Sequence, residues 1–258
     1  METGTIRYEL EAGVAWITLA RPDRMNSLNA AMRRELLAAL TRAPEEARAV
    51  VLTGEGRGFC SGQDLGDASR FEDLNLSETL REEYEPLLAA LGDCPVPTVA
   101  AVNGPAAGAG ANLALAADIV IAARSASFIQ AFARIGLIPD AGGTYWLPRQ
   151  VGKARAMGMC LTTDPVPAET AAEWGLIWQM VEDDALMTRA AGLAGQLAEG
   201  PTLAFRLMKR ALRESGTNSL EDQLALEAEL QGEAGRSRDF MEGVMAFLEK
   251  RAPRFEGR

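Results

Sequence analysis

Two segments rich in small residues have the composition of a site that binds a ligand through its backbone. They are Gly-Phe-Cys-Ser-Gly-Gln-Asp-Leu at 58–65 and Gly-Pro-Ala-Ala-Gly-Ala-Gly at 104–110. Small residues let a ligand approach the chain closely, and a helix that follows adds its N-terminal N–H groups and dipole. Two such junctions can aim two N–H donors at one oxygen, which is an oxyanion hole. Two ordinary tight turns are the alternative, and the spacing alone favours the turns.

Asp140 is the candidate acid or base, within Gly-Leu-Ile-Pro-Asp-Ala-Gly-Gly at 136–143. Pro-Asp-x-Gly is also a routine turn sequence in which the aspartate makes local hydrogen bonds, and taken alone this interpretation is preferred. Leu137 and Ile138 nevertheless flank the carboxylate, and desolvation by such neighbours raises a carboxyl pKa toward the range of a useful base. Both interpretations stay open at this point.

Several other kinds of chemistry are excluded. None of the 258 residues is histidine, which removes Ser-His and Cys-His catalysis and histidine-ligated metal sites. Residues 58–62 match a nucleophile elbow centred on Cys60, but no imidazole can orient it, so we interpret Cys60 as a small buried thiol. Residues 104–110 lack the spacing of a dinucleotide site, and Lys153 lacks the second glycine of a phosphate loop.

The elements that must position these segments are short apolar strands alternating with helices. Strands are expected at 14–19, 49–53, 97–102 and 118–123, and the two small-residue segments follow the second and third of them. Helices are expected at 29–40 with Asn29 as the cap, at 80–91 behind a capping box that starts at Thr79, and at 111–117. Near-continuous apolar strands separated by helices indicate a parallel sheet covered on both faces.

The pattern changes after about Gly152, and from Ala168 onward it is almost entirely helical. Pro201 fits the first position of a helix, and Ser219 and Ser237 fit the caps of two more. The sequence therefore predicts an α/β core followed by a helical C-terminal region, with no flexible hinge between them.

Charge and cysteine content limit the partners. The chain has 26 Lys and Arg against 36 Asp and Glu, a formal charge of −10, which argues against broad binding to nucleic acid or to an anionic membrane. Cys60, Cys94 and Cys160 are odd in number and form no CxxC pair, which favours a reducing compartment. No signal-like segment and no apolar run of ~18 residues is present. We expect a cytoplasmic protein without nucleic-acid or membrane partners.

Taken together, the chain resembles the crotonase (enoyl-CoA hydratase/isomerase) superfamily over nearly its whole length. The matching segments are Arg-Pro at 21–22 with Asn-Ser-Leu at 26–28, then 58–65, 101–110 with Asp118, 136–144, 168–177 and 242–247. The resemblance implies a mixed α/β fold: a spiral of ββα units over 1–195 and a helical trimerisation region over 196–258. It also implies a homo-oligomer, either a trimer or a dimer of trimers.

The resemblance assigns roles to individual residues. The backbone N–H groups of Gln63 and Ala109 match an oxyanion hole for the thioester oxygen of an acyl-CoA. Other positions match segments that bind coenzyme A or the acyl group, and they are Arg24, Met25, Ser61, Asp64, Leu65, Phe132, Phe247 and Lys250. A solvated surface charge is the alternative for Arg24, and the last two lie in a tail that can touch the coenzyme A of a neighbouring subunit. No metal or cofactor is implied, since coenzyme A is part of the substrate.

Two departures from the family pattern bear on the reaction. Members that add water to a double bond use two glutamates, and this chain has Asn112 and Phe132 at those positions. Neither side chain exchanges a proton at neutral pH, so water addition by the usual route is not expected. Asp140 lies where some isomerases and dehalogenases of the superfamily carry their carboxylate, and it is left to act as base and acid.

The resemblance therefore implies an isomerase that acts on an unsaturated or ring-epoxide acyl-CoA through a thioester enolate. It is greatest to members that convert ring-epoxyphenylacetyl-CoA to an oxepin in phenylacetate catabolism. An enoyl-CoA hydratase and a non-catalytic acyl-CoA-binding protein are the alternatives.

Overall fold

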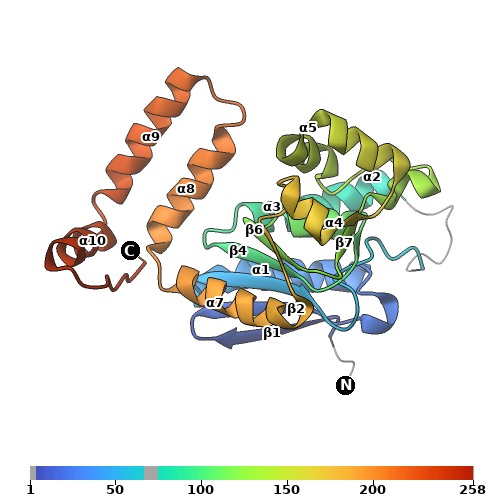
Figure 1. Cartoon of the computed structure of the whole chain (residues 1–258), viewed down its shortest axis with the longest axis horizontal. Coiled ribbons are helices and arrows are strands. Elements are labelled where there is room, and N and C mark those ends of the chain that lie inside the picture. The colour runs from blue at the N-terminus through green and yellow to red at the C-terminus, as the bar shows by residue number, and fades with distance from the viewer. Residues whose placement is uncertain (1–3, 67–74, 258) are drawn as a thin grey trace.

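A six-stranded sheet forms the centre of the computed structural model, which describes residues 4–66 and 75–257 (Figure 1). In spatial order its strands are β1 (Ile6–Glu11), β2 (Val14–Leu19), β3 (Ala49–Gly54), β4 (Thr98–Val102), β6 (Ile119–Ala123) and β9 (Gln179–Val181). From β2 to β9 every neighbouring pair is parallel. Residues 98–102 of β4 are all buried, which confirms the predicted cover on both faces.

Strand β1 corrects the expectation of a purely parallel sheet. It pairs antiparallel with β2, so that Ile6 lies opposite Leu19 and Glu11 opposite Val14. Its sequence, Ile-Arg-Tyr-Glu-Leu-Glu, has charged residues at alternate positions, and the strand is mostly exposed. An antiparallel edge strand with one solvated face is compatible with such a pattern, whereas near-continuous apolar runs indicate only the strands that are buried on both faces.

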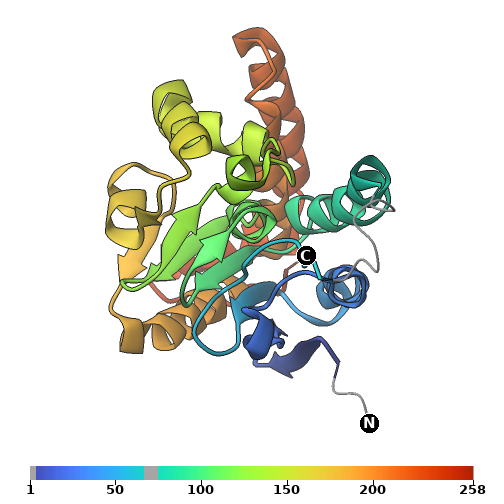
Figure 2. The same cartoon turned by 90° about the vertical axis from the view of Figure 1, so that its right-hand side faces the viewer.

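Helices and short turns connect and cover the strands. The helices are α1 (Ala30–Glu46), α2 (Leu76–Thr79), α3 (Glu85–Gly92), α4 (Ala109–Leu115), α5 (Gly143–Thr162), α6 (Ala168–Glu173), α7 (Leu186–Ala198), α8 (Thr202–Glu214), α9 (Leu220–Ala234) and α10 (Arg238–Glu249). Helix α7 packs across β2, β3, β4 and β6, whereas α1 packs on β1 and β2. Figure 2 shows α5 at the top of the body and α7 at its base.

The start of the second predicted helix lies four residues earlier than expected. Asn75, not Thr79, is the cap, since its Oδ1 accepts a hydrogen bond from the Glu78 N–H at 3.2 Å. The chain then continues as a π-helical turn, Leu80–Tyr84, directly into α3. The other predicted caps are confirmed, because Asn29, Ser219 and Ser237 each accept a backbone N–H three residues on. Pro201 precedes α8 as its cap, one position before the one predicted.

A small second sheet lies beside the glycine-rich loops. It consists of β5 (Ala106–Ala107), β7 (Ser127–Ile129) and β8 (Val166–Pro167). Strand β5 pairs parallel with β7 and leads directly into α4, which starts two residues earlier than the predicted 111. A 3₁₀ turn, Ala131–Ile135, follows β7 and carries the chain toward Asp140.

The C-terminal helical region begins at about residue 200. The predicted domain boundary at 195/196 falls within α7, which still packs against the sheet. Helices α8 and α9 form an antiparallel pair with a small core of Leu207, Leu226 and Leu230, and they stand apart in Figure 1. Within the described ranges, no helix is both long enough and apolar enough to span a bilayer.

Candidate active site

The structure brings the two small-residue segments together side by side. Leaving β3, the chain passes through 58–65, and leaving β4 it passes through 103–108. Phe59 N donates to Pro105 O at 3.1 Å, and Ala107 N donates to Cys60 O at 2.9 Å. The two loops are therefore paired backbone to backbone, which two unrelated tight turns would not be.

Strand-like pairing fixes the direction of the Gln63 N–H. Leu28 N donates to Gly62 O at 2.8 Å, and Asp64 N donates to Leu28 O at 3.2 Å. Since successive peptide groups in an extended chain point to opposite sides, the Gln63 N–H points away from Leu28. Within the described part of the chain this N–H has no acceptor.

Ala109 presents the second N–H at the first position of α4. Gly108 precedes it with a φ of +52°, a conformation that favours glycine, and no side chain caps this helix end. Gly62 has a φ of +91°, and a Cβ there would lie 2.8 Å from Ala107 O and 3.3 Å from Ala109 N. Among the described residues the Ala109 N–H also has no acceptor, so both N–H groups are without a partner, as the predicted oxyanion hole requires.

Asp140 lies in the loop between the 3₁₀ turn and α5. Its Oδ1 is buried and has no hydrogen-bond partner among residues 4–66 and 75–257. Burial raises the pKa of Asp140 from 3.8 to about 6, against a smaller lowering by its own backbone N–H. Gly143 N donates to Asp140 O at 2.8 Å, so the predicted Pro-Asp-x-Gly turn is present as well. Here the turn holds the carboxyl in a desolvated position, and the two sequence interpretations are compatible.

Asn112, which occupies one of the two positions matched to a glutamate of other family members, has a structural role. Asn112 is fully buried, its Nδ2 donates to Asp140 O at 2.8 Å, and its Oδ1 accepts from Gln130 Nε2 at 2.8 Å. The amide thereby ties α4 to the turn that carries Asp140. A Cβ on Gly143 would lie 2.4 Å from Asn112 Nδ2, so the glycine allows this close approach.

A cavity of about 240 Å³ lies between these groups. Its lining includes the predicted residues Ser61, Gln63, Leu65, Ala109, Phe132 and Asp140, together with Leu76, Leu80, Tyr84, Ile135 and Leu137. Asp140 is the one carboxylate among the lining residues that the structure describes, and most of the remaining lining is apolar. The arrangement can hold a small apolar group next to one base and two N–H donors.

Other predicted residues lie around the cavity or away from it. Arg24 is exposed. The next residue, Met25, accepts a hydrogen bond at its backbone oxygen from Ser61 N at 2.9 Å, so Arg24 and Met25 lie at the edge of the loop 58–65. The Asp64 carboxylate pairs with Arg21 at 2.8 Å. Phe247 and Lys250 lie at the end of α10, on the far side of the molecule from α2 and α4 in Figure 1.

Sequence reasoning missed three groups near the cavity. Tyr84 and Arg134 line it, and Arg33 reaches the side chain of Gln63. Arg33 was detectable in principle, because it lies three and seven residues before Leu36 and Leu40 on the buried stripe of α1. A cation on such a stripe predicts a buried partner.

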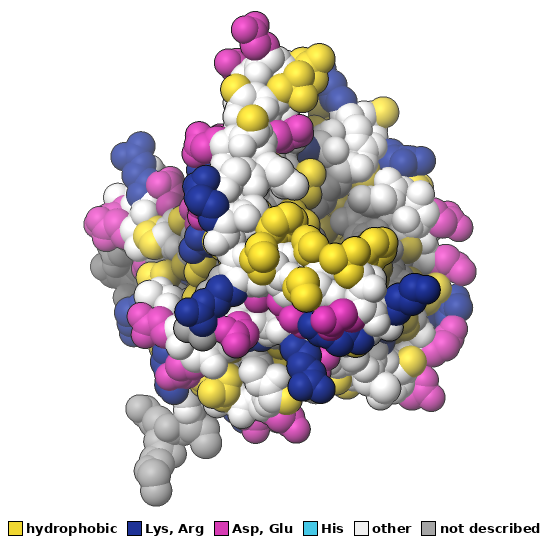
Figure 3. Space-filling model, turned by 90° about the vertical axis from the view of Figure 1, so that its left-hand side faces the viewer, with side chains coloured by type: hydrophobic (Ala, Val, Ile, Leu, Met, Phe, Trp, Pro, Cys, Tyr) yellow, Lys and Arg dark blue, Asp and Glu magenta, His cyan; other side chains and the backbone are white. Residues whose placement is uncertain are grey.

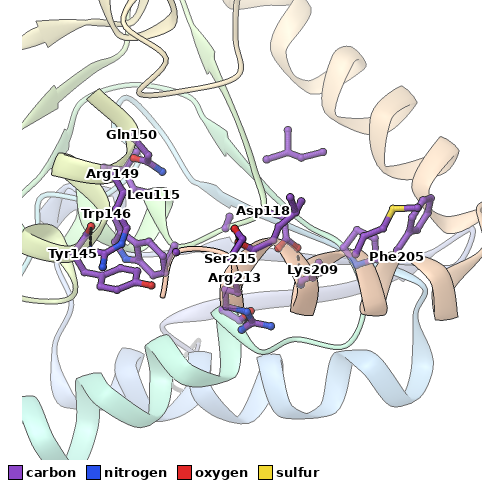
Figure 4. Close-up of a pocket in the computed structure, with 18 of the residues that line it drawn as sticks. Leu115, Asp118, Tyr145, Trp146, Arg149, Gln150, Phe205, Lys209, Arg213 and Ser215 are labelled. Carbon is purple, nitrogen blue, oxygen red and sulfur yellow. Dashed lines mark hydrogen bonds and ion pairs between the residues drawn. The ribbon is translucent and has the colours of Figure 1, made fainter. Parts of the chain in front are cut away.

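A larger cavity, of about 640 Å³, lies between α5 and α8 (Figure 4). Asp118 and Lys209 point toward each other there and form an ion pair at 2.6 Å. Lys209 Nζ also donates to Cys94 O and Val96 O. These charged groups are used in attaching α8 to the body, so the smaller cavity is the better candidate for chemistry. No cluster of side chains that could hold a metal ion occurs among residues 4–66 and 75–257.

Comparisons with known proteins find relatives that cover nearly the whole chain. The family model described as Enoyl-CoA hydratase/isomerase matches residues 9–258. A Rhodobacter capsulatus protein named "Probable enoyl-CoA hydratase" is 64% identical over 258 residues, covering all of both chains. The 1,2-epoxyphenylacetyl-CoA isomerase of Escherichia coli is 49% identical over 260 residues, covering 98% of each. The crystal structure of an enoyl-CoA hydratase from Bacillus anthracis superimposes with a TM-score of 0.91 at 34% identity, covering 98% of this chain and 100% of that one.

Proposed function

Because the chain belongs to the enoyl-CoA hydratase/isomerase family, we propose that it is an isomerase of an unsaturated or ring-epoxide acyl-CoA. The predicted membership of the crotonase superfamily and its fold is confirmed, so the chain is an enzyme of a family that acts on acyl-CoA thioesters. Within this family, our proposal is that the reaction is isomerisation and not hydration.

The observation that carries the proposal is Asp140, the one carboxylate among the described residues that line the cavity, whose buried Oδ1 has no hydrogen-bond partner among those residues. In the proposed reaction this carboxylate removes a proton from the carbon next to the thioester carbonyl. The electron pair moves into the carbonyl, and the enolate oxygen accepts hydrogen bonds from the N–H groups of Gln63 and Ala109. The Asp140 carboxylic acid then returns the proton to another carbon of the conjugated system, so the product has the mass of the substrate.

The first candidate substrate is ring-epoxyphenylacetyl-CoA, with an oxepin as the product. Two features support it: the 49% identity to the E. coli 1,2-epoxyphenylacetyl-CoA isomerase, and the apolar lining with Phe132 and Tyr84, which suits a ring. In that ring substrate the carbon–carbon bond shared by the epoxide and the six-membered ring breaks, and both carbon–oxygen bonds remain, which gives the seven-membered oxepin. The proton that Asp140 removes next to the thioester is returned to a carbon of the ring, so the product again has the mass of the substrate. The remaining predicted contacts to coenzyme A, at Arg24, Met25 and the loop 61–65, are part of this proposal.

An enoyl-CoA hydratase is the second candidate, and a specific observation favours it. The relative at 64% identity is named as a hydratase. Against this stand Asn112, whose amide is occupied by Asp140 O and Gln130, and Phe132, which has no exchangeable proton. A third candidate, an acyl-CoA-binding protein without turnover, predicts binding and no product at all.

A panel of CoA thioesters assayed by mass spectrometry separates the candidates. Isomerisation leaves the mass unchanged, whereas hydration adds the mass of one water. We expect Asp140→Asn to lower isomerase turnover by about 10²–10⁴-fold. The control is Asp164→Asn, the same change at an exposed position outside the cavity lining. Turnover of Asp140→Asn within a few-fold of the wild type would reject Asp140 as the base, and robust hydration of crotonyl-CoA would favour the second candidate.

We further propose a homo-oligomer, as a trimer or a dimer of trimers, located in the cytoplasm. Figure 3 shows hydrophobic side chains gathered over the C-terminal helices. On α10 the exposed apolar residues are Phe240, Met241, Val244, Met245, Phe247 and Leu248. A continuous apolar patch of this kind supports contact with another chain, and the free thiols of Cys60 and Cys94 support a reducing compartment.

A further inference from the structure

The side chain of Gln63 lies in a buried polar cluster that its backbone role alone does not require. Tyr84 Oη donates to Gln63 Oε1 at 2.5 Å, and Arg33 Nη1 donates to the same oxygen at 2.9 Å. Arg33 is only 3% exposed and Tyr84 only 4%. A single amide oxygen thus accepts hydrogen bonds from two buried donors, one of them a cation.

Arg33 also holds the backbone that Gln63 pairs with. Its Nη1 donates to Leu28 O at 2.6 Å, and Leu28 is the residue whose backbone groups bind Gly62 and Asp64 on either side of Gln63. One guanidinium group therefore fixes both the side chain of Gln63 and the partner strand that sets the direction of its N–H. A change in the position of Arg33 would loosen both contacts.

The charge of Arg33 is compensated by this cluster. Its Nε forms an ion pair with Glu83 Oε2 at 2.7 Å, and its guanidinium lies 5.2 Å from the centre of the Tyr84 ring. A buried guanidinium is unfavourable unless nearby groups pair with it and accept its hydrogen bonds. The Arg33 side chain contacts Leu28, Gln63 and the π-helical turn. Its buried charge is therefore stabilised only while these three parts of the chain stay together.

The π-helical turn Leu80–Tyr84 brings Tyr84 to the cluster. Such turns are rare within helices and occur often at functional sites. Tyr84 lines the cavity together with Asp140 and Phe132 while its hydroxyl donates to Gln63. Burial raises the pKa of Tyr84 above its ordinary value, so the hydroxyl remains a donor at neutral pH.

We propose that Arg33 and Tyr84 are positioning residues of the reaction, which keep the backbone N–H of Gln63 aimed at the thioester oxygen by holding its side chain. This inference rests on the proposed role of Gln63. Small misplacements of a group that stabilises a transition state lower the rate strongly, while the ground-state complex is affected less. The cluster accordingly acts on kcat more than on KM.

The experiment uses two variants and a matched pair of controls. Tyr84→Phe removes one hydroxyl, and Arg33→Lys keeps the charge but removes the forked donors. Arg42 of α1 and Tyr8 of β1 form the same kind of contact, with the guanidinium 4.7 Å from the ring centre. Arg42 is exposed and lies nine residues, or more than two helical turns, beyond Arg33 on α1. Tyr8→Phe and Arg42→Lys therefore make the same chemical changes outside the cluster.

Two measurements are made on each variant. We expect kcat to fall about tenfold in Tyr84→Phe and Arg33→Lys, with KM within about threefold, and neither to change in the controls. The second is the infrared stretch of cinnamoyl-CoA labelled with ¹³C at the thioester carbonyl. Hydrogen bonds from the N–H groups lower this frequency on binding, and we expect the shift to be smaller in the two variants.

The carbonyl frequency can be measured without knowing the reaction. It therefore tests the positioning role of Arg33 and Tyr84 separately from the proposed oxyanion role of Gln63 and Ala109. A wild-type frequency and a wild-type kcat in Tyr84→Phe would overturn the positioning role. No frequency shift in the wild-type protein would instead overturn the oxyanion role of Gln63 and Ala109, and with it the proposed function. If Arg33→Lys does not fold, Tyr84→Phe decides. In addition, Gln63→Met and Tyr84→Phe should not be additive, since both remove the same hydrogen bond.

Discussion

The burial of Asp140, which supports its proposed role as the base, would also make the activity of the enzyme depend on pH. Burial raises its pKa from 3.8 to about 6, and only the ionised form accepts a proton from substrate. We therefore expect kcat/KM to rise with pH to an inflection near pH 6 and to fall about tenfold per pH unit well below it. Rates measured from pH 4.5 to 8.5 check this. An inflection near pH 4 would mean that substrate finds Asp140 solvated.

The raised pKa of Asp140 also has a consequence for stability. The folded state prefers the protonated carboxyl, so the favourable contribution is fully present below pH 3.8 and is lost as pH rises through about 6. We expect Asp140→Asn, which cannot ionise, to be more stable than the wild type by roughly 1–2 kcal/mol at pH 8, after allowing for partial exposure, with the difference vanishing near pH 4. Urea unfolding at both pH values measures it, and an equal difference at both would contradict it.

Residue roles were predictable where a side chain acts locally and not where it acts across the chain. The motif around Asp140 carried its turn and one apolar neighbour that lines the cavity with it, Leu137, whereas the other predicted neighbour, Ile138, is 79% exposed. Arg33 and Tyr84 are 30 and 21 positions from Gln63, and only the packing of α1 against the π-helical turn brings them to it. The resemblance showed that Asn112 departs from the family's glutamate. Only the folded structure shows that its side chain links α4 to the backbone of Asp140.

At the scale of elements, the two loops that follow β3 and β4 depend on the absence of a side chain at Gly62. A Cβ there would lie 2.8 Å from Ala107 O, and φ is +91°. We expect Gly62→Ala to separate the two N–H donors and lower kcat by about 10²–10³, the effect of losing one donor. Gly152→Ala is the control, because φ is +77° there but a Cβ meets nothing within 4 Å. If both variants lose activity equally, backbone strain and not loop separation is the cause.

Local chemistry explains which elements the sequence predicted correctly. The strands at 14–19, 49–54 and 98–102 are buried apolar runs, and the caps at Asn29, Ser219 and Ser237 act within one helical turn. The capping box at Thr79 was wrong because helical backbone already surrounds it on both sides, so no free helix end exists there for it to cap. Strand β1 was missed because an edge strand alternates charge with apolar residues instead of forming a continuous apolar run.

At the scale of the whole molecule, the C-terminal helices expose an apolar surface that another chain could cover. Phe240, Val244, Phe247 and Leu248 recur at helical spacing along the sequence, a pattern that gives a stripe on one side of a helix but not the direction in which it faces. In the structure Phe247 is 83% exposed and Leu248 68%, so the stripe faces outward from the chain. An isolated chain would leave this area in water, which is unfavourable in proportion to its size.

We expect the double variant Val244→Asp/Phe247→Asp to dissociate the proposed oligomer into single chains of 27.6 kDa. Both positions lie on the same stripe of α10, and two buried carboxylates without partners would oppose association. Val244→Ile/Phe247→Leu, which keeps the stripe apolar, should leave the assembly intact. Sedimentation velocity at micromolar concentration measures the mass of each. A trimer or hexamer that persists in the charged variant would show that α10 does not form the contact, and a wild-type protein that sediments as one chain would reject the oligomer itself.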